Sequence, residues 1–174
     1  MSNYLNGKTA FITGAAGGLG LSLAEDLADK GVNVCGTDIR YELLKEELAR
    51  ISDKYKVETM ALKVDVSDES DVVNPVEGNI GKWGKIDILI NNAGIRIVGP
   101  LEDVTTKTWS DIQDTNLKGQ FLCTREVLKK AMIRQNEGVI IFLSSDAGKQ
   151  GEKDNSVYCA SKWGALRRVC RKRV

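Results

Sequence analysis

The chain has 174 residues and a formal net charge of +1; 42% of its residues are hydrophobic and 28% are charged. This composition is typical of one folded domain, and we treat residues 1–174 as a single domain. No apolar run reaches the length of about 18 residues that a membrane-spanning helix needs. The N-terminus also lacks a basic stretch followed by a long apolar one. We therefore expect a cytoplasmic protein with no membrane partner.

The chain contains no histidine, which excludes Ser-His-Asp and Cys-His catalysis and histidine-ligated zinc. Its four cysteines form no CxxC pair, so we expect free thiols and no metal site. Basic residues gather at the C-terminus, at Arg167, Arg168, Arg171, Lys172 and Arg173. The rest of the chain offers no matching basic face with interleaved aromatic residues, so we expect no nucleic-acid partner.

Short apolar runs alternate with amphipathic segments along the chain. Strands are predicted, in chain order, at 8–13, 32–37, 57–64, 86–91 and 138–144. Helices are predicted at 19–30, 41–54, 70–81 and 117–135. Pro75 lies inside the third helix, where we expect a kink or a restart. This alternation predicts an α/β fold, a Rossmann-like doubly wound parallel sheet.

A glycine-rich segment, TGAAGGLG at 13–20, follows the first strand directly and runs into a helix. Glycine lets the backbone approach a pyrophosphate closely, and a helix N-terminus offers unpaired N–H groups and a positive dipole end. The segment therefore predicts a phosphate-binding loop in which Gly14, Gly18, Leu19 and Gly20 contact a dinucleotide. A glycine-rich turn without a ligand is the alternative.

Asp38 stands at the end of the second predicted strand. A carboxylate at this position can accept hydrogen bonds from both hydroxyls of an adenosine ribose and would repel a 2′-phosphate, which favours NAD over NADP. Arg40, two residues later, weakens that preference. The alternative is a surface aspartate that caps the helix beginning near Tyr41.

The spacing TGxxxGxG resembles the short-chain dehydrogenase/reductase family, and further marks of that family follow in order. Asp65 and Val66, after the third strand, resemble the pair that contacts the adenine. The sequence NNAG at 91–94 matches the family motif, which implies that Asn92, Ala93 and Gly94 bind the cofactor. From the residues alone, Asp65 could equally cap a helix or a turn.

Tyr158 and Lys162 stand four residues apart and would share one face of a helix. The same spacing occurs at 4–8 and 41–45, but only Tyr158 follows a strand that ends in serines. A tyrosine can exchange protons near neutral pH when a nearby ammonium stabilises its phenolate, and Lys162 would supply that charge.

The family resemblance implies roles for four catalytic residues. Tyr158 would be the general acid/base and Lys162 its partner, and both would also contact the cofactor. Ser145 would hold the reacting oxygen, and Asn116 would hold a water in a proton relay from Lys162. Each has a plainer alternative: a strand-end cap for Ser145, the N-cap of a long helix for Asn116, and a solvated helix charge for Lys162.

These observations favour an NAD-dependent oxidoreductase that transfers hydride between nicotinamide and a secondary alcohol or ketone. The segment at 148–156 resembles polyol and sugar-alcohol dehydrogenases of the family, although 3-oxoacyl reductases share the scaffold. A non-catalytic NAD-binding fragment of such an enzyme is the alternative. A methyl-transferring protein would leave NNAG, Tyr158 and Lys162 unexplained.

The sequence departs from the family after Lys162. The resemblance implies that a sixth strand, substrate-loop helices, a seventh strand and a Pro-Gly turn are missing, so we interpret the chain as truncated. We expect the fifth strand to lose a neighbour and become an edge. Family members are homo-oligomers, and their dimer face includes the helix that begins near Ser156, so the truncation puts oligomerisation in doubt.

Overall fold

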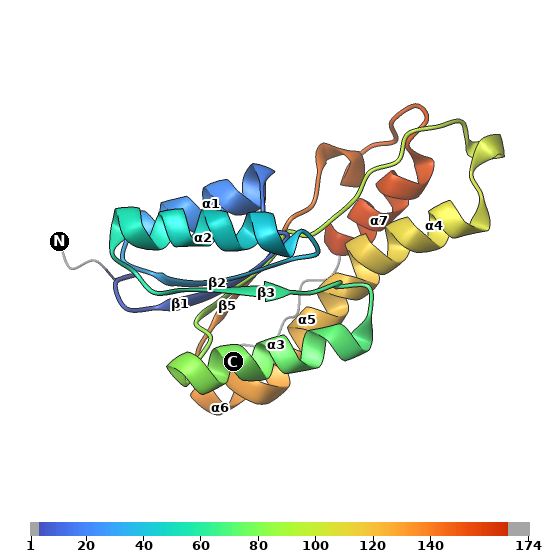
Figure 1. The fold of residues 1–174 in the computed structure, drawn as a ribbon. Coiled ribbons are helices and arrows are strands. Elements are labelled where there is room, and N and C mark those ends of the chain that lie inside the picture. Colours follow the sequence, from blue (N-terminus) through green and yellow to red (C-terminus); the bar gives the residue numbers. More distant parts are fainter. Residues whose placement is uncertain (1–3, 167–174) are drawn as a thin grey trace.

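The computed structural model describes residues 4–166, which form a parallel sheet covered by helices on both faces (Figure 1). The strands are β1 (Thr9–Thr13), β2 (Asn33–Asp38), β3 (Thr59–Lys63), β4 (Ile88–Asn91) and β5 (Val139–Phe142). The helices are α1 (Gly18–Asp29), α2 (Tyr41–Tyr55), α3 (Glu69–Trp83), α4 (Thr106–Gln113), α5 (Gly119–Val127), α6 (Ile133–Gln135) and α7 (Ser156–Leu166). Shorter helical turns are η1 (Leu101–Asp103), η2 (Asp114–Lys118), η3 (Leu128–Met132) and η4 (Asp146–Gly148).

The sheet separates two apolar cores because successive side chains of a strand point to opposite faces. Ile12 of β1 packs in the core beneath α1 and α2, together with Leu48. Its neighbour Phe11 packs on the other face, in the core that includes Val76 of α3 and Val127 of α5. All residues of β1 are buried, which explains its continuous apolar sequence.

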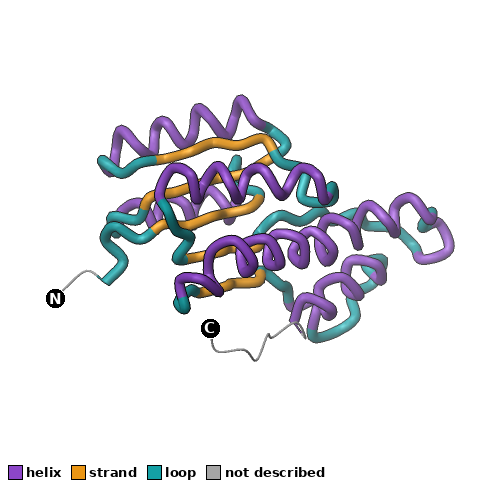
Figure 2. The backbone as a smooth tube through the Cα atoms, turned by 90° about the horizontal axis from the view of Figure 1, so that it is seen from below, coloured by secondary structure: helices purple, strands orange, loops and turns teal. Residues whose placement is uncertain are grey.

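The strand order is β3-β2-β1-β4-β5, and all neighbouring strands are parallel. The order reverses at β1, which pairs with β2 on one side and with β4 on the other. Doubly wound sheets bind ligands outside the carboxyl ends of the strands at such a point. Figure 1 shows the sheet as one layer with α1 and α2 on one side and α3 on the other, and Figure 2 shows the strands side by side. The predicted fold class is therefore confirmed.

The structure corrects two predictions about the helices, the start of the long helix and the restart at Pro75. The helix predicted at 117–135 begins earlier, at Thr106, and continues through α4, η2, α5, η3 and α6 to Gln135. No restart occurs at Pro75, since α3 runs without interruption from Glu69 to Trp83. A proline within a helix removes one backbone donor, and Pro75, Val72 and Val76 are all buried, so α3 packs against the core on both sides of the proline.

The sheet ends at β5, as expected from the sequence, among the residues that the structure describes. Val139 and Ile141 of this edge strand are exposed.

Burial raises the pKa of the Cys35 and Cys123 thiols to about 12, which fits unreactive core positions. The basic cluster at 167–173 and Cys170 lie outside the described residues. Within 4–166, no helix has the length and apolar character required to cross a bilayer.

Candidate active site

The glycine loop after β1 is held against the loop after β4. The Asn92 side-chain amide donates hydrogen bonds to the backbone oxygens of Thr13, at 2.9 Å, and Gly14, at 3.0 Å. The Thr13 hydroxyl in turn accepts hydrogen bonds from the backbone N–H groups of Asn92 and Ala93, both at 3.0 Å. TG at 13–14 and NNAG at 91–94 therefore form one hydrogen-bonded unit at the switch point.

Glycine is required in this unit for space as well as for conformation. Gly14 has a φ of +67°, and a Cβ atom there would lie 2.9 Å from the Cα atom of Ala93. A Cβ atom on Gly20 would overlap the backbone oxygen of Gly14. Gly18, at the start of α1, has a φ of +54° and open space around it, so only its conformation favours glycine. Leu19 is exposed in the first turn of the same helix.

Asp38 ends β2 with its side chain buried, so the alternative of a surface aspartate was wrong. One carboxylate oxygen accepts from the backbone N–H of Ala16 at 3.1 Å and the other from that of Arg40 at 2.9 Å. The Arg40 guanidinium also pairs with both oxygens at 3.2 Å. Burial alone would raise the pKa of Asp38, but these hydrogen bonds and the Arg40 charge lower it, so the carboxylate stays ionised.

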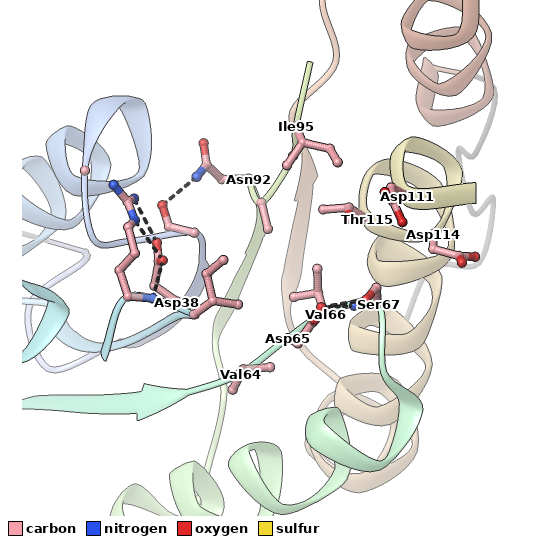
Figure 3. Close-up of a pocket in the computed structure, with 16 residues that line it drawn as sticks. Asp38, Val64, Asp65, Val66, Ser67, Asn92, Ile95, Asp111, Asp114 and Thr115 are labelled. Carbon is pink, nitrogen blue, oxygen red and sulfur yellow. Dashed lines mark hydrogen bonds and ion pairs between the residues drawn. The ribbon is translucent and has the colours of Figure 1, made fainter. Parts of the chain in front are cut away.

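A cleft of about 640 Å³ opens at the carboxyl ends of β1 to β4 (Figure 3). Seven of its lining residues were predicted as cofactor contacts: Gly14, Asp38, Asp65, Val66, Asn92, Ala93 and Gly94. Arg40, which was expected to weaken the preference for NAD, also lines the cleft. Residues that sequence reasoning did not assign to the site line it as well, and these include Ser67, Ile95 and Thr115. Gly18, Leu19 and Gly20 do not line this cleft.

Asp65 lines the cleft and also organises its own turn. Its carboxylate accepts hydrogen bonds from the Ser67 backbone N–H at 2.9 Å and the Ser67 hydroxyl at 2.6 Å, so the turn-cap interpretation describes its carboxylate correctly. Val66 is buried and packs against Gly119. A Cβ atom added to Gly119 would lie 2.8 Å from the Val66 side chain. This contact packs one wall of the cleft against α5.

Lys162 is buried on α7, so the alternative of a solvated charge was wrong. Its ammonium donates to the backbone oxygen of Leu143 at 3.0 Å and lies 5.6 Å from the centre of the Tyr158 ring. Burial lowers the pKa of Lys162 below its ordinary value. Tyr158 and Lys162 therefore lie on one face of α7, as their spacing predicts, and this face is beside the end of β5.

Asn116 is fully buried in η2, inside a continuous helical run, so it is not the N-cap of a helix. Its side-chain oxygen accepts from the Ile95 backbone N–H at 2.7 Å. Its amide donates to the Ile95 backbone oxygen at 2.9 Å and to the Ser161 hydroxyl at 3.0 Å. Asn116 thus joins the loop after β4 to α7, between Tyr158 and Lys162.

Ser145 caps η4 by accepting a hydrogen bond from the Ala147 backbone N–H at 3.2 Å, as the plainer alternative expected. The preceding Ser144 donates to the backbone oxygen of Lys162 at 2.8 Å. The serine-ended strand is thereby tied to α7, and the hydroxyl proton of Ser145 stays available to a further acceptor.

Gly94 connects the residues that line the cleft with Asn116 and Lys162. It lines the cleft, and a Cβ atom there would lie 3.1 Å from the Asn116 side-chain oxygen and 3.4 Å from the Lys162 ammonium. Asn116, Ser145, Tyr158 and Lys162 themselves do not line the cleft. The structure therefore places Asn116 and Lys162 next to the cleft and not inside it.

Arg96 is a residue of this region that sequence reasoning missed. Its guanidinium donates to the side chain of Asn155 at 2.9 Å and to Glu152 at 3.2 Å, and lies 5.6 Å from the centre of the Tyr158 ring. Tyr158 therefore stands between two cations, Arg96 and Lys162. Local spacing carries no signal for Arg96, because its partners are 56 and 59 residues away in the chain.

The fold and the site define an α/β protein with a dinucleotide-type glycine loop and a Tyr-Lys pair at the carboxyl edge of its sheet. The family model described as short chain dehydrogenase matches residues 8–169. The chain belongs to this family.

Relatives of the chain include reductases and dehydrogenases. It is 35% identical over 162 residues to a 3-oxoacyl-(acyl-carrier-protein) reductase of Staphylococcus aureus, covering 91% of this chain and 64% of that protein. It is 37% identical over 158 residues to a galactitol 2-dehydrogenase of Agrobacterium fabrum, covering 91% of this chain and 60% of that protein. A structure of NAD+-bound xylitol dehydrogenase matches with a TM-score of 0.90 and 32% identity, covering 94% of this chain and 62% of the other. The chain thus spans less than two thirds of the length of these relatives.

Proposed function

We propose that this chain carries the nucleotide-binding and proton-transferring parts of an NAD(P)-dependent oxidoreductase that acts on a secondary alcohol or ketone. The observation that carries the proposal is the position of Lys162, buried on α7 beside the Tyr158 ring and next to the glycine-walled cleft. A buried ammonium beside a phenol is an arrangement suited to proton transfer without histidine.

The residues around the cleft fit a nicotinamide dinucleotide. The open space at Gly18 and the free N–H groups at the start of α1 suit a pyrophosphate. Asp38 at the end of β2 suits the adenosine ribose and supports NAD as the proposed cofactor, while Asp65 and Val66 suit the adenine. A bound nicotinamide would supply the hydride.

The chain's own residues would handle the proton and the reacting oxygen. Tyr158 would donate a proton to the carbonyl oxygen during reduction and take it back during oxidation. Lys162 would stabilise the phenolate, Ser145 would donate a hydrogen bond to the reacting oxygen, and Asn116 would keep η2 and α7 aligned and hold a water toward Lys162. The relatives named for galactitol, xylitol and 3-oxoacyl substrates support a polyol, a sugar alcohol or a 3-oxoacyl compound as the proposed substrate class.

A second candidate is nucleotide binding without turnover. The observation that favours it is that the cleft is lined by the nucleotide-binding residues and by none of the four catalytic candidates. The two candidates predict different results with the same preparation. Both predict saturable binding of NADH, and only the first predicts oxidation or reduction of a substrate.

Replacing Tyr158 by Phe separates the two candidates. We expect Tyr158→Phe to lower turnover of xylitol, galactitol or a 3-oxoacyl thioester by about a hundredfold or more, because general acid/base catalysis contributes that much, and to leave NADH binding intact. Tyr41→Phe is the matched control, because Tyr41 and Lys45 repeat the spacing on α2. Unchanged turnover in Tyr158→Phe would contradict the proposed mechanism. NADH binding with no turnover in the unmodified chain would support the second candidate.

A further inference from the structure

Arg96, in the loop after β4, is held in place by the segment that precedes α7. Its Nε donates to the Asn155 side-chain oxygen at 2.9 Å, and its Nη2 donates to a Glu152 carboxylate oxygen at 3.2 Å. Asn155 is buried, so it offers Arg96 a fixed partner. The Gly99 backbone N–H ties the same two segments together by donating to the Asp154 backbone oxygen at 2.8 Å. The guanidinium is therefore oriented before any ligand binds.

The same guanidinium keeps hydrogen-bond donors that no described residue uses. A guanidinium carries five N–H donors, and within residues 4–166 only the Nε and Nη2 of Arg96 meet an acceptor. The N–H groups of Nη1 have no acceptor in this part of the chain. The Arg96 side chain is 52% exposed, so a ligand can reach it from solvent.

These unused donors lie beside the proposed proton donor. The Arg96 Cζ atom lies 5.6 Å from the centre of the Tyr158 ring, and so does the Lys162 ammonium. Lys162 is buried and its ammonium is bonded to a backbone oxygen, so Arg96 is the cation of the two that an incoming molecule can contact. A substrate whose reacting oxygen meets Tyr158 would bring the atoms near its reacting carbon next to this guanidinium.

The chemistry of the guanidinium favours a carboxylate at that position. Arginine stays ionised at every working pH, and its planar N–H groups match the two oxygens of a carboxylate. Hydrogen bonds between charged groups are about twice as strong as neutral ones, so a carboxylate gains more here than the hydroxyl of a polyol does. Glu152 accepts only from Nη2 and is 32% exposed, so water screens its repulsion of a second carboxylate.

We propose that Arg96 is a substrate-specificity residue that selects compounds with a carboxylate close to the reacting carbon. The substrate class is then a hydroxy acid or the corresponding oxo acid, such as a polyhydroxy acid or a free 3-oxo acid, in preference to a neutral polyol or an ester. Arg96 binds the carboxylate while Tyr158 exchanges the proton with the reacting oxygen. This inference rests on the proposed function, since it assumes that Tyr158 meets the reacting oxygen.

The test measures the dissociation constants of 3-oxobutanoate and its methyl ester for the 174-residue chain in the presence of NAD+, by isothermal titration calorimetry. The two probes share a ketone and differ in charge, and NAD+ cannot reduce either of them, so binding is measured apart from turnover. We define the acid preference as the dissociation constant of the ester divided by that of the acid. It should be about tenfold to a hundredfold in the unmodified chain, the range expected for one hydrogen bond to a charged group. Arg96→Gln should abolish most of it, and Arg96→Lys, which keeps the charge without the paired N–H groups, should retain part of it.

Glu152→Gln and Arg134→Gln are the matched controls. Glu152→Gln breaks the same ion pair but leaves the guanidinium in place, so the acid preference should stay the same or rise. A purely structural role of the pair would instead lower the acid preference in Glu152→Gln and Arg96→Gln alike. Arg134 is exposed on α6, whose last residue, Gln135, bonds to the Ile86 backbone oxygen at the amino end of the sheet. Arg134→Gln should leave the acid preference unchanged.

The possible outcomes separate the inference from the proposed function. Tighter binding of the ester than of the acid, an unchanged acid preference in Arg96→Gln, or an equal fall in Glu152→Gln would overturn the inference alone. Failure of both probes to bind a chain that binds NAD+ would do the same. Failure of a folded chain to bind NAD+ or NADH would overturn the proposed function and the inference together.

Discussion

The ammonium of Lys162 on α7 donates a hydrogen bond to the backbone oxygen of Leu143, at 3.0 Å, just beyond the end of β5. Within residues 4–166, no carboxylate lies within ion-pair distance of this ammonium. A buried cation with a neutral partner carries an uncompensated desolvation cost, which is why burial lowers its pKa. The cation is therefore held beside the Tyr158 ring at a cost in stability.

This cost should appear in the pH dependence of unfolding. Between the lowered folded-state pKa of Lys162 and its ordinary value of 10.5, the unfolded chain binds more protons than the folded one. The free energy of unfolding contributed by this group therefore rises as the pH rises toward that value. We define the stability difference as the free energy of unfolding of the unmodified chain minus that of the variant. For Lys162→Met, urea denaturation from neutral pH upward should show that this difference increases with pH.

Lys8 provides the control for this experiment. Hydrogen bonds with Glu137 and Asp87 raise the pKa of Lys8 above 10.5, so its contribution is complete below 10.5 and is lost as the pH rises from 10.5 through its folded-state value. The corresponding difference for Lys8→Met should stay flat over the same range. A difference for Lys162→Met that falls with increasing pH would contradict the assignment of Lys162 as a destabilised buried cation.

Asn116 should be essential for stability as well as for the proposed chemistry. Asn116→Ala removes three hydrogen bonds and leaves the backbone groups of Ile95 without their partner. At about 1 kcal/mol for each bond, the free energy of unfolding should fall by about 3 kcal/mol. Asn74→Ala, on the exposed face of α3, should change it by about 0.5 kcal/mol or less. Equal losses from the two variants in urea denaturation would contradict this role.

The strands and the glycine loop after β1 could be predicted from sequence because their constraints are local. A parallel strand buried on both faces is apolar throughout, as β1 is, and a glycine whose Cβ atom would meet backbone, such as Gly20, leaves no choice of residue. The spacing of Tyr158 and Lys162 similarly fixes a common helix face.

The start of α4 and the role of Arg96 could not be predicted, because neither leaves a local pattern. α4 has eight residues and only two large apolar side chains, Trp109 and Ile112, which is too short a pattern to predict a helix. Arg96 bonds to Asn155 and Glu152, which are distant in sequence and are brought together only by the fold. The burial of Lys162 has the same origin, since α7 is covered there by segments that are distant in sequence: the chain after β5, α4 and η2.

The glycines of the predicted phosphate loop should respond differently to alanine. Gly20→Ala should cost about 3 kcal/mol or more, because the new Cβ atom would overlap the Gly14 backbone and press on Asn92. The Cβ atom added in Gly18→Ala would meet no other atom within 4 Å. This variant should lower the free energy of unfolding by about 1 to 2 kcal/mol, because alanine disfavours the left-handed backbone conformation of residue 18. Gly78→Ala, in α3 with no atom within 4 Å of the added carbon, should stabilise the chain by about 1 kcal/mol.

Thermal and urea denaturation of these three variants would test whether their changes in the free energy of unfolding follow this order. If Gly18→Ala proved as damaging to stability as Gly20→Ala, the difference in available space would not be what separates them. Binding of NADH adds a second measurement. Gly18→Ala should weaken it although the chain stays folded, because the start of α1 is the proposed pyrophosphate site.

Asp87 should contribute stability that is lost in acid. Burial raises the pKa of this carboxyl, but hydrogen bonds from the Thr9 backbone N–H, at 2.7 Å, and from the ammonium groups of Lys85 and Lys8 outweigh burial and hold the pKa below 3.8. A carboxyl with a depressed folded-state pKa stabilises the fold above 3.8 and loses that contribution as the pH falls through the folded-state value.

Asp87→Asn should therefore lower the free energy of unfolding by about 2 kcal/mol at neutral pH, because it removes charge-assisted hydrogen bonds that join the starts of β1 and β4. The difference from the unmodified chain should shrink as the pH falls below 3.8. Asp53→Asn, at an exposed position of α2, is the control and should show little difference at any pH. If the loss in Asp87→Asn were the same at neutral and acid pH, it would come from altered packing of the strand ends and not from the charge of Asp87.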